Sequence, residues 1–202
     1  MEQLQYVIED STIAELLGVQ NFTNDESAVL ELVKNAYDAN ASSVDLKFEG
    51  TTLTITDTGD GMSAFDIKNY WMHVGKSPKT YDVINPKGQR RVLAGAKGIG
   101  RFALARLGRQ VEIQSKKEGF PRVVWRTDWN QSTIGDLTFD GVHGTKIIIS
   151  DLREKWNKKK VENLKLFLSK TYNATEMEIR ISHPEVSCVV PASVSYTHLR
   201  AH

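Results

Sequence analysis

The order of hydrophobic and polar positions divides the chain into helical and strand-like segments. Apolar residues at helical spacing predict helices near residues 9–18, 24–40, 99–108 and 157–173. Alternating or short apolar runs predict strands within residues 43–57, 109–129, 144–150 and 176–182. The first two strand segments are interrupted at Gly50 and Gly119, so each is expected to fold as a hairpin.

This succession of elements predicts an α+β fold. We expect a two-layer α/β sandwich, with a mixed, mostly antiparallel sheet that carries its helices on one face. Ser11 or Thr12 is expected to cap the first helix, and Gly18 to end it. Residues 71–98 are rich in Gly, Pro and Lys without sustained periodicity, which predicts a mobile loop.

Length and composition indicate one ordinary globular domain. The chain has 202 residues, of which 40% are hydrophobic and 25% charged, and a net charge of +1. That charge argues against a uniformly basic nucleic-acid binder. The domain is predicted to span residues 1–190, followed by a disordered or cloning-derived tail at 191–202.

The cellular compartment is expected to be the cytoplasm. Cys188 is the single cysteine, so no internal disulfide can form and a reducing compartment fits. The first ten residues lack the apolar run of a secretory signal. No stretch approaches the roughly 20 apolar residues that cross a bilayer.

The segment "TITDTGDGM", residues 54–62, ends an apolar strand in Asp57 and a glycine turn. A carboxylate delivered there is an acceptor at the mouth of a pocket, and the glycines let a flat ligand approach the backbone. Such a carboxylate accepts a hydrogen bond from the amino group of adenine and repels the carbonyl oxygen of guanine. A plain hairpin is the alternative, whereas the spacing does not fit a calcium loop.

The segment "GAKGIGRF", residues 95–102, is rich in glycine and leads directly into a predicted helix. Free N–H groups at a helix start can bind phosphates, although a glycine cluster is often only a turn. The spacing matches neither the Walker loop nor the dinucleotide motif. The preceding loop is basic, which by itself favours a solvated loop. Closure over a triphosphate and contact with nucleic acid are the alternatives.

The segment "ELVKNAYDAN", residues 31–40, places Glu31, Asn35 and Asp38 in one polar line on a helix. Alone, this pattern favours a solvated face. Beside an adenine-type carboxylate and a phosphate-type glycine turn, it favours a ligand site. Asn35 could then ligate Mg²⁺, and Glu31 could accept a proton from a water that attacks the terminal phosphate.

These motifs, in this order, resemble those of the GHKL ATPases (the Bergerat fold), which include gyrase B subunits, the large heat-shock chaperones, sensor histidine kinases and MutL-type repair proteins. The resemblance covers residues 10–182 and adds "GTKIIIS", residues 144–150, as a final motif. The segments "HVGKSPK" and "GIGRF" are also similar to MORC-type ATPases and their bacterial relatives.

The resemblance implies ATP and Mg²⁺ as cofactors. It assigns Glu31 as catalytic base, Asn35 as the metal ligand and Asp57 as the partner of the adenine amino group. The remaining implied positions are Asp38 beside the base, Gly61 and Met62 at the adenine, Thr145 at an adenine-bridging water, Lys76 and Ser77 in the lid, and Gly95, Lys97, Gly98, Ile99 and Gly100 around the phosphates.

The function implied is Mg²⁺-dependent ATP binding and hydrolysis by a conformational switch within a longer protein. The alternatives are a histidine-kinase catalytic domain, which Glu31 disfavours, and a regulatory module with negligible turnover. Many relatives complete the site with a lysine from a following domain, so hydrolysis by this chain is expected to be weak. ADP, downstream domains and an ATP-dependent homodimer are expected partners; nucleic acid is left open, and no membrane is expected.

Overall fold

The computed structural model describes residues 9–73, 82–84, 90–92, 100–138, 142–172 and 176–191. Eight strands form one sheet in the order β10-β9-β1-β2-β8-β5-β6-β7, and β3 and β4 pair separately. The large sheet consists of β1 (Ser43–Glu49), β2 (Thr52–Asp57), β5 (Gly108–Lys116), β6 (Arg122–Thr127), β7 (Ser132–Leu137), β8 (Gly144–Leu152), β9 (Glu178–His183) and β10 (Val186–Val189). Only β1 and β9 pair in parallel within this sheet, so the predicted mixed, mostly antiparallel sheet is confirmed.

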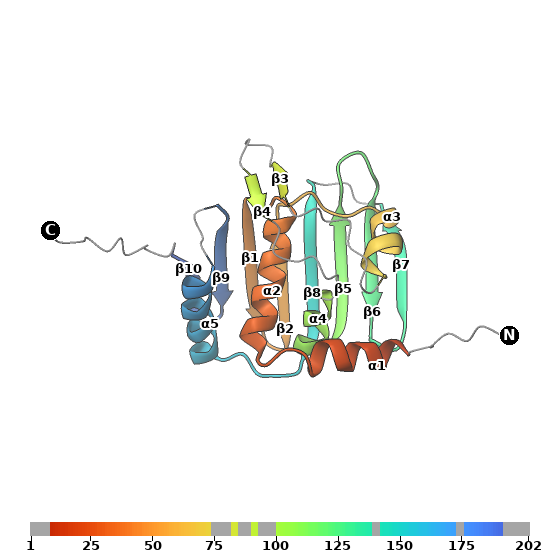
Figure 1. Ribbon diagram of the computed structural model, residues 1–202. Helices are drawn as coiled ribbons and strands as arrows, with labels where there is room; N and C mark the ends of the chain where they lie inside the picture. Colours follow the sequence, from red (N-terminus) through yellow and green to blue (C-terminus); the bar gives the residue numbers. More distant parts are fainter. Residues whose placement is uncertain are drawn as a thin grey trace.

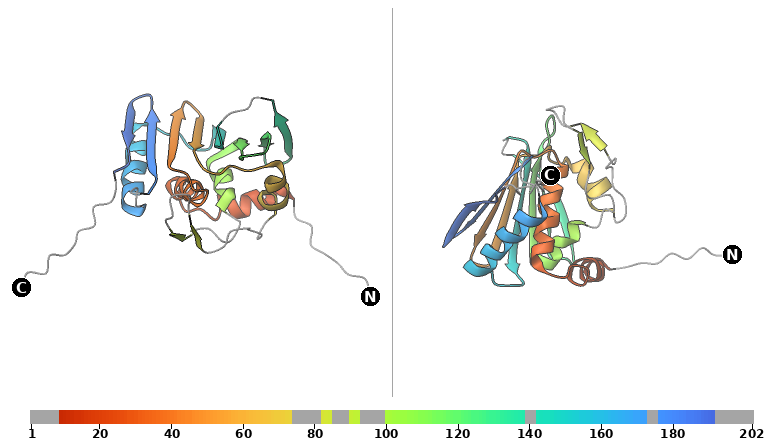
Figure 2. Two further views of the ribbon diagram at one scale, coloured as in Figure 1. Left: turned by 90° about the horizontal axis from the view of Figure 1, so that it is seen from above. Right: turned by 60° about the vertical axis from the view of Figure 1, so that its left-hand side comes forward.

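The helices cover one face of this sheet, as Figures 1 and 2 show. They are α1 (Asp10–Ala14), α2 (Asp25–Asp38), α3 (Ala64–Asp66), α4 (Ala103–Leu107) and α5 (Lys158–Thr171), with the short turns η1 (Glu15–Val19), η2 (Ile67–Trp71) and η3 (Gly100–Phe102). The apolar stripes of the helices and the inward residues of the strands form one buried core. The α+β sandwich expected from the sequence is therefore confirmed.

Helix α2 begins where its sequence signal predicts. Asn24 is the N-cap, and its side-chain oxygen accepts a hydrogen bond of 2.8 Å from the Ser27 backbone N–H. Asp25, 4% exposed, forms ion pairs with Arg106 of α4 and Lys160 of α5. These pairs hold the start of α2 against both neighbouring helices and so orient the whole helix over the sheet.

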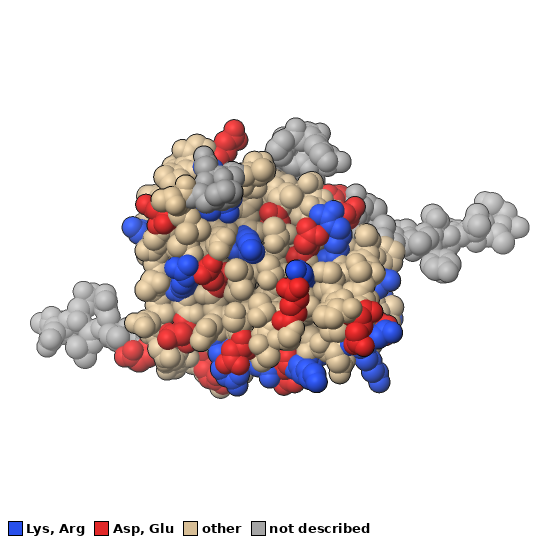
Figure 3. Space-filling view, turned by 180° about the vertical axis from the view of Figure 1, so that it is seen from behind, with Lys and Arg blue, Asp and Glu red and all other residues tan. Residues whose placement is uncertain are grey.

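The opposite face of the sheet carries mixed charges. Figure 3 shows Lys and Arg interspersed with Asp and Glu over this face. Ion pairs such as Arg126 with Glu112 join neighbouring strands there. Because side chains alternate between the faces of a strand, the polar positions of β1 lie on this side while Val44, Leu46 and Phe48 enter the core.

Several elements differ from the sequence prediction. Neither Ser11 nor Thr12 caps the first helix, because α1 begins at Asp10, and Gly18 lies buried inside η1 against Ala105. Strands β7 and β10 were not predicted, since both are short edge strands with exposed positions. Within the predicted loop of residues 71–98, the hairpin of β3 (Asp82–Ile84) and β4 (Arg90–Val92) is described and the rest mostly is not.

Across the described ranges, none of the helices combines the length and the apolar character needed to pass through a bilayer. Residues 192–202, which make up most of the predicted tail, lie outside these ranges.

Candidate functional site

Asp57 is the last residue of β2, and its carboxylate is held by the backbone. Oδ1 accepts hydrogen bonds from the Gly59 N–H at 2.8 Å and from the Thr145 N–H at 3.3 Å. Oδ2 accepts none from the described part of the chain. One oxygen is therefore fixed in place, while the other keeps its capacity to accept a hydrogen bond from a ligand.

The turn after Asp57 needs glycine for two reasons. Gly61 has a φ of +69°, and a Cβ there would lie 2.1 Å from the carbonyl oxygen of Lys116 on β5. The backbone N–H of Met62 then donates to Ser115 Oγ at 2.8 Å. The turn is thus pressed against the end of β5, and any larger residue at position 61 would push it away.

Ser115 joins this turn to the last predicted motif. Its side chain is fully buried, and its hydroxyl lies 2.9 Å from Thr145 Oγ1 as well as accepting from Met62. Asp57, Met62 and Thr145 therefore belong to one hydrogen-bonded group at the adjoining ends of β2, β8 and β5, and Gly61 lies in the same turn.

The pKa of the Asp57 carboxyl is raised to about 6, mainly by burial and to a smaller extent by the nearby Asp60 carboxylate, while hydrogen bonds from Gly59 and Thr145 oppose the shift. The folded protein therefore binds this proton more tightly than the unfolded chain does. The stability that protonation contributes is fully present below pH 3.8 and is lost as the pH rises through about 6.

This titration predicts how stability depends on pH. Between pH 7 and pH 4, the free energy of unfolding of the parent should rise relative to that of Asp57→Asn, by at most about 3 kcal/mol. Urea denaturation of both proteins at several pH values measures the difference. A difference that stays constant, or that falls with acidification, would contradict the raised pKa.

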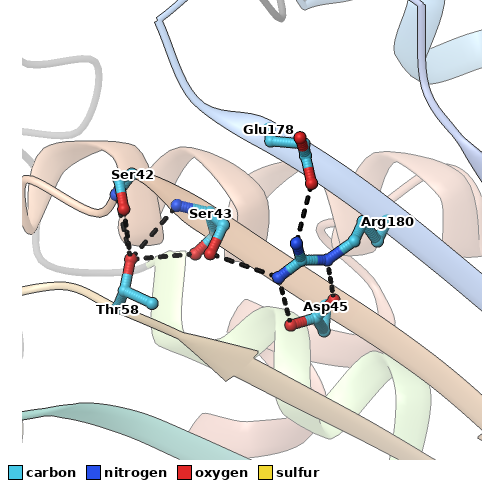
Figure 4. A network of polar contacts seen from close by, with 6 residues as sticks. All are labelled: Ser42, Ser43, Asp45, Thr58, Glu178 and Arg180. Atoms are coloured by element: carbon cyan, nitrogen blue, oxygen red, sulfur yellow. Dashed lines mark hydrogen bonds and ion pairs between the residues drawn. The ribbon is translucent and has the colours of Figure 1, made fainter. Parts of the chain in front are cut away.

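The C-terminal end of α2 is bonded to the same turn. The Asp60 N–H donates to the Ala39 carbonyl at 2.7 Å. Thr58, which follows Asp57, is bonded to the residues that lead from α2 into β1. Its hydroxyl oxygen accepts hydrogen bonds from the backbone N–H groups of Ser42 and Ser43 at 3.0 and 3.1 Å (Figure 4). These bonds fix the position of the Asp57 turn relative to α2.

Glu31 lies farther back along α2, against the start of η3. A Cβ added to Gly100 would lie 2.5 Å from Glu31 Oε1, so the Gly100 backbone passes directly beside this carboxylate. The Glu31 side chain is 25% exposed and lies 4.0 Å from the Lys34 ammonium. The structure thus brings two of the predicted residues, the candidate base and the last glycine of the glycine-rich segment, into contact.

Asn35 and Asp38 follow Glu31 along α2. Asn35, four residues later, is partly buried, whereas Asp38 is 9% exposed in the last turn. The described residues contain no cluster of three or more His, Cys, Asp or Glu side chains that could hold a metal ion. A cation beside α2 would therefore need further oxygen ligands from a bound ligand or from water.

The Asp57 turn meets the C-terminal end of α2 at Ala39, whereas Gly100 meets the same helix farther back, at Glu31. Glu31 and Ala39 are eight positions apart, which corresponds to roughly 12 Å along the helix axis. The remaining predicted site residues, Lys76, Ser77, Gly95, Lys97, Gly98 and Ile99, lie outside the described residues.

Sequence reasoning missed two polar residues around Asp57. Ser115 follows Val111 and Ile113 at inward positions of β5, and a serine in such a row signals a buried polar partner. His143 lies with Nδ1 2.8 Å from the Gly59 carbonyl, and no periodicity in its surroundings predicts this contact.

Comparison with known proteins identifies the type of domain. The family model described as "Histidine kinase-, DNA gyrase B-, and HSP90-like ATPase" matches residues 22–138. A putative type II restriction enzyme, HgiDII of Herpetosiphon aurantiacus, is 30% identical over 137 residues, or 61% of this chain and 22% of that protein. The DNA mismatch repair protein pms1 of Schizosaccharomyces pombe is 23% identical over 150 residues, or 72% of this chain and 18% of its own length.

The chain therefore matches about a fifth of the length of each of these relatives. Because the shared part is this small, the likeness bears on the type of domain and not on the activity of the whole proteins.

Proposed function

Since this chain belongs to the histidine kinase-, DNA gyrase B- and HSP90-like ATPase family, we propose that it binds ATP with Mg²⁺ and hydrolyses it as the conformational switch of a longer protein. The domain that does this is proposed to comprise residues 1–190. Membership of the family establishes the type of domain; the residue roles, the metal and the turnover are the proposal.

The observation that carries the proposal is the state of the Asp57 carboxylate. Oδ1 is occupied by two backbone N–H groups, and Oδ2 remains an acceptor at the start of a glycine turn. Adenine offers an amino N–H to such an acceptor, whereas guanine offers a carbonyl oxygen that the carboxylate repels. Met62 and Thr145, tied together through Ser115, would line the same end.

The proposed triphosphate site lies where Glu31 of α2 meets Gly100. Gly100 has no side chain to separate its backbone from Glu31, and it opens η3 and α4. The first N–H groups of a helix have no acceptor within the helix, so they are available to an anion. We propose that Gly95, Lys97, Gly98 and Ile99 continue this phosphate-binding surface, with Lys76 and Ser77 in a lid over it.

Asn35 suits a magnesium ion that is held mainly by phosphate oxygens and water. Mg²⁺ keeps several waters and takes few protein ligands, which fits one amide oxygen and no acidic cluster among the residues described. When bound, the ion would neutralise charge on the phosphates. Asn35 would hold it, Asp38 would support the polar end of α2, and Glu31 would accept the proton of an attacking water.

The longer protein is proposed to couple this cycle to DNA. Both relatives are named for processes on DNA, restriction in one case and mismatch repair in the other. The chain covers a small part of each, so the parts that contact DNA would lie in other domains. An ATP-dependent homodimer is proposed as the moving assembly, because closing a site over its ligand can drive such a rearrangement.

The base preference tests this proposal directly. With Mg²⁺ present, ATP should bind at least tenfold more tightly than GTP, because a hydrogen bond to a charged acceptor, worth roughly 1.5–3 kcal/mol, is exchanged for a repulsion. Isothermal titration calorimetry with both nucleotides measures the ratio. Chelation of Mg²⁺ should weaken ATP binding; equal affinities for ATP and GTP would refute the adenine assignment.

A further inference from the structure

A cavity lies on the helical side of the sheet, and the residues assigned to ATP do not line it. Its volume is about 80 Å³, enough for about half a dozen water-sized positions. The described residues around it come from α1, the end of η2, η3, the start of α4 and the β6–β7 hairpin. They include none of Glu31, Asn35, Asp57, Gly61 or Thr145.

The cavity contains an arginine that forms no ion pair with the described residues. Arg101 lines it, and its guanidinium makes no hydrogen bond or ion pair with the described residues. Its neighbours are aromatic: Cζ lies 6.0 Å from the Trp71 ring centroid and 5.0 Å from that of Phe102. Burial lowers the pKa of Arg101 to about 10, so this cation is poorly solvated.

Two further donors in the same wall lack acceptors among the described residues. The indole Nε1 atoms of Trp71 and Trp125 are buried and have no hydrogen-bond partner there, and the rings meet edge to face at 5.9 Å. Trp125 is only 5% exposed. Buried N–H groups are nearly always paired, so these two indoles and the Nη2 atom of Arg101 form an unusual group of unpaired donors among the described residues beside the cavity.

We propose that this cavity is a binding site for a small carboxylate, which Arg101 holds through its guanidinium while the tryptophans enclose the short hydrocarbon part. A carboxylate matches the fork of a guanidinium and carries a single charge. Inorganic phosphate fits less well, because the remaining walls are mainly aromatic and aliphatic and would strip its other oxygens of water.

Asp10 gives the proposal an internal electrostatic check. It is exposed on α1 and also lines the cavity, so its negative charge faces an incoming anion. Because the group is in solvent, its repulsion is weak but has a definite sign. Removal of this charge should tighten carboxylate binding, whereas removal of the Arg101 charge should weaken it.

The four tryptophans allow a direct test by NMR on the ¹⁵N-labelled protein. Sodium propionate is titrated at constant ionic strength against sodium chloride, with propionamide as the uncharged analogue. We expect saturable shifts of the Trp71 and Trp125 indole N–H signals with propionate alone. Trp156, which packs on Phe48 in the core, is the internal control.

Three variants complete the test. Arg101→Gln should weaken propionate binding at least tenfold, and Asp10→Asn should strengthen it. Ile13→Phe fills the cavity from α1 and should weaken binding with Arg101 intact, so the test stands even if the Arg101 variant does not fold.

Identical shifts from chloride or propionamide, unmoved indole signals, or full binding by Arg101→Gln would each overturn the proposal. No nucleotide takes part in these titrations, so their outcome is independent of the proposed ATPase function.

Discussion

Replacement of Asp57 by asparagine is expected to weaken ATP binding about a hundredfold. The parent carboxylate offers Oδ2 to the adenine amino group, and a hydrogen bond to a charged acceptor contributes roughly 1.5–3 kcal/mol. That range corresponds to about ten- to 150-fold in affinity. The change is isosteric, so the loss reports chemistry at one atom and not the shape of the site.

The backbone decides how the new amide is oriented. The N–H groups of Gly59 and Thr145 both point at Oδ1 of Asp57, so the oxygen of the substituted amide must occupy that position. The amide nitrogen then takes the place of Oδ2 and presents two donors to the donor of adenine. Guanine, which has a carbonyl oxygen there, should lose much less affinity or gain some.

Calorimetry with ATP and GTP on the parent and on Asp57→Asn measures both effects. Asp136→Asn, which changes an exposed aspartate of β7, is the matched control and should bind like the parent. If Asp57→Asn bound ATP with the parent affinity, Asp57 would not contact the base.

Replacement of Glu31 by glutamine is expected to stop turnover while leaving ATP binding almost intact. A positioned general base typically accelerates a reaction by about 10²–10⁴. Glutamine has the same shape but cannot take a proton from water. We therefore expect phosphate release to fall at least about a hundredfold and ATP affinity to change by less than about threefold.

The position of Glu31 makes this test selective. Its carboxylate lies beside Gly100, and its partner Lys34 is 4.0 Å away on the solvent side, so the isosteric change removes little stability. Glu162→Gln, on the exposed side of α5, is the control. Single-turnover phosphate release is the measurement, and a parent-like rate in Glu31→Gln would rule out the catalytic role.

Much of the architecture could be predicted from local signals. Asn24 caps a strongly periodic helix, and Gly50 and Gly119 mark two hairpins that form as expected. The failures have local causes. Gly18 suggests a helix end, yet it is buried inside η1. Glycine is needed there because a Cβ would lie 2.6 Å from the Phe102 carbonyl oxygen. Strands β7 and β10 lie at sheet edges, where half-exposed positions weaken the alternating pattern.

The candidate site could be predicted only in part, because its members come together through tertiary structure. The motifs located Asp57, Gly61 and Glu31, whose residue types carry the chemistry. Ser115 had no such motif, since its role depends on the register of β5 against β8, which places it opposite Thr145. Arg101 and the tryptophans around it likewise follow from packing and not from spacing.

A crystal structure of the protein with Mg²⁺ and a non-hydrolysable ATP analogue tests the central claim most directly. We expect the adenine amino group to donate to Asp57 Oδ2, the amide oxygen of Asn35 to bind the cation, and the terminal phosphate to lie between Glu31 and Gly100. A nucleotide bound elsewhere, or a base that does not contact Asp57, would contradict it.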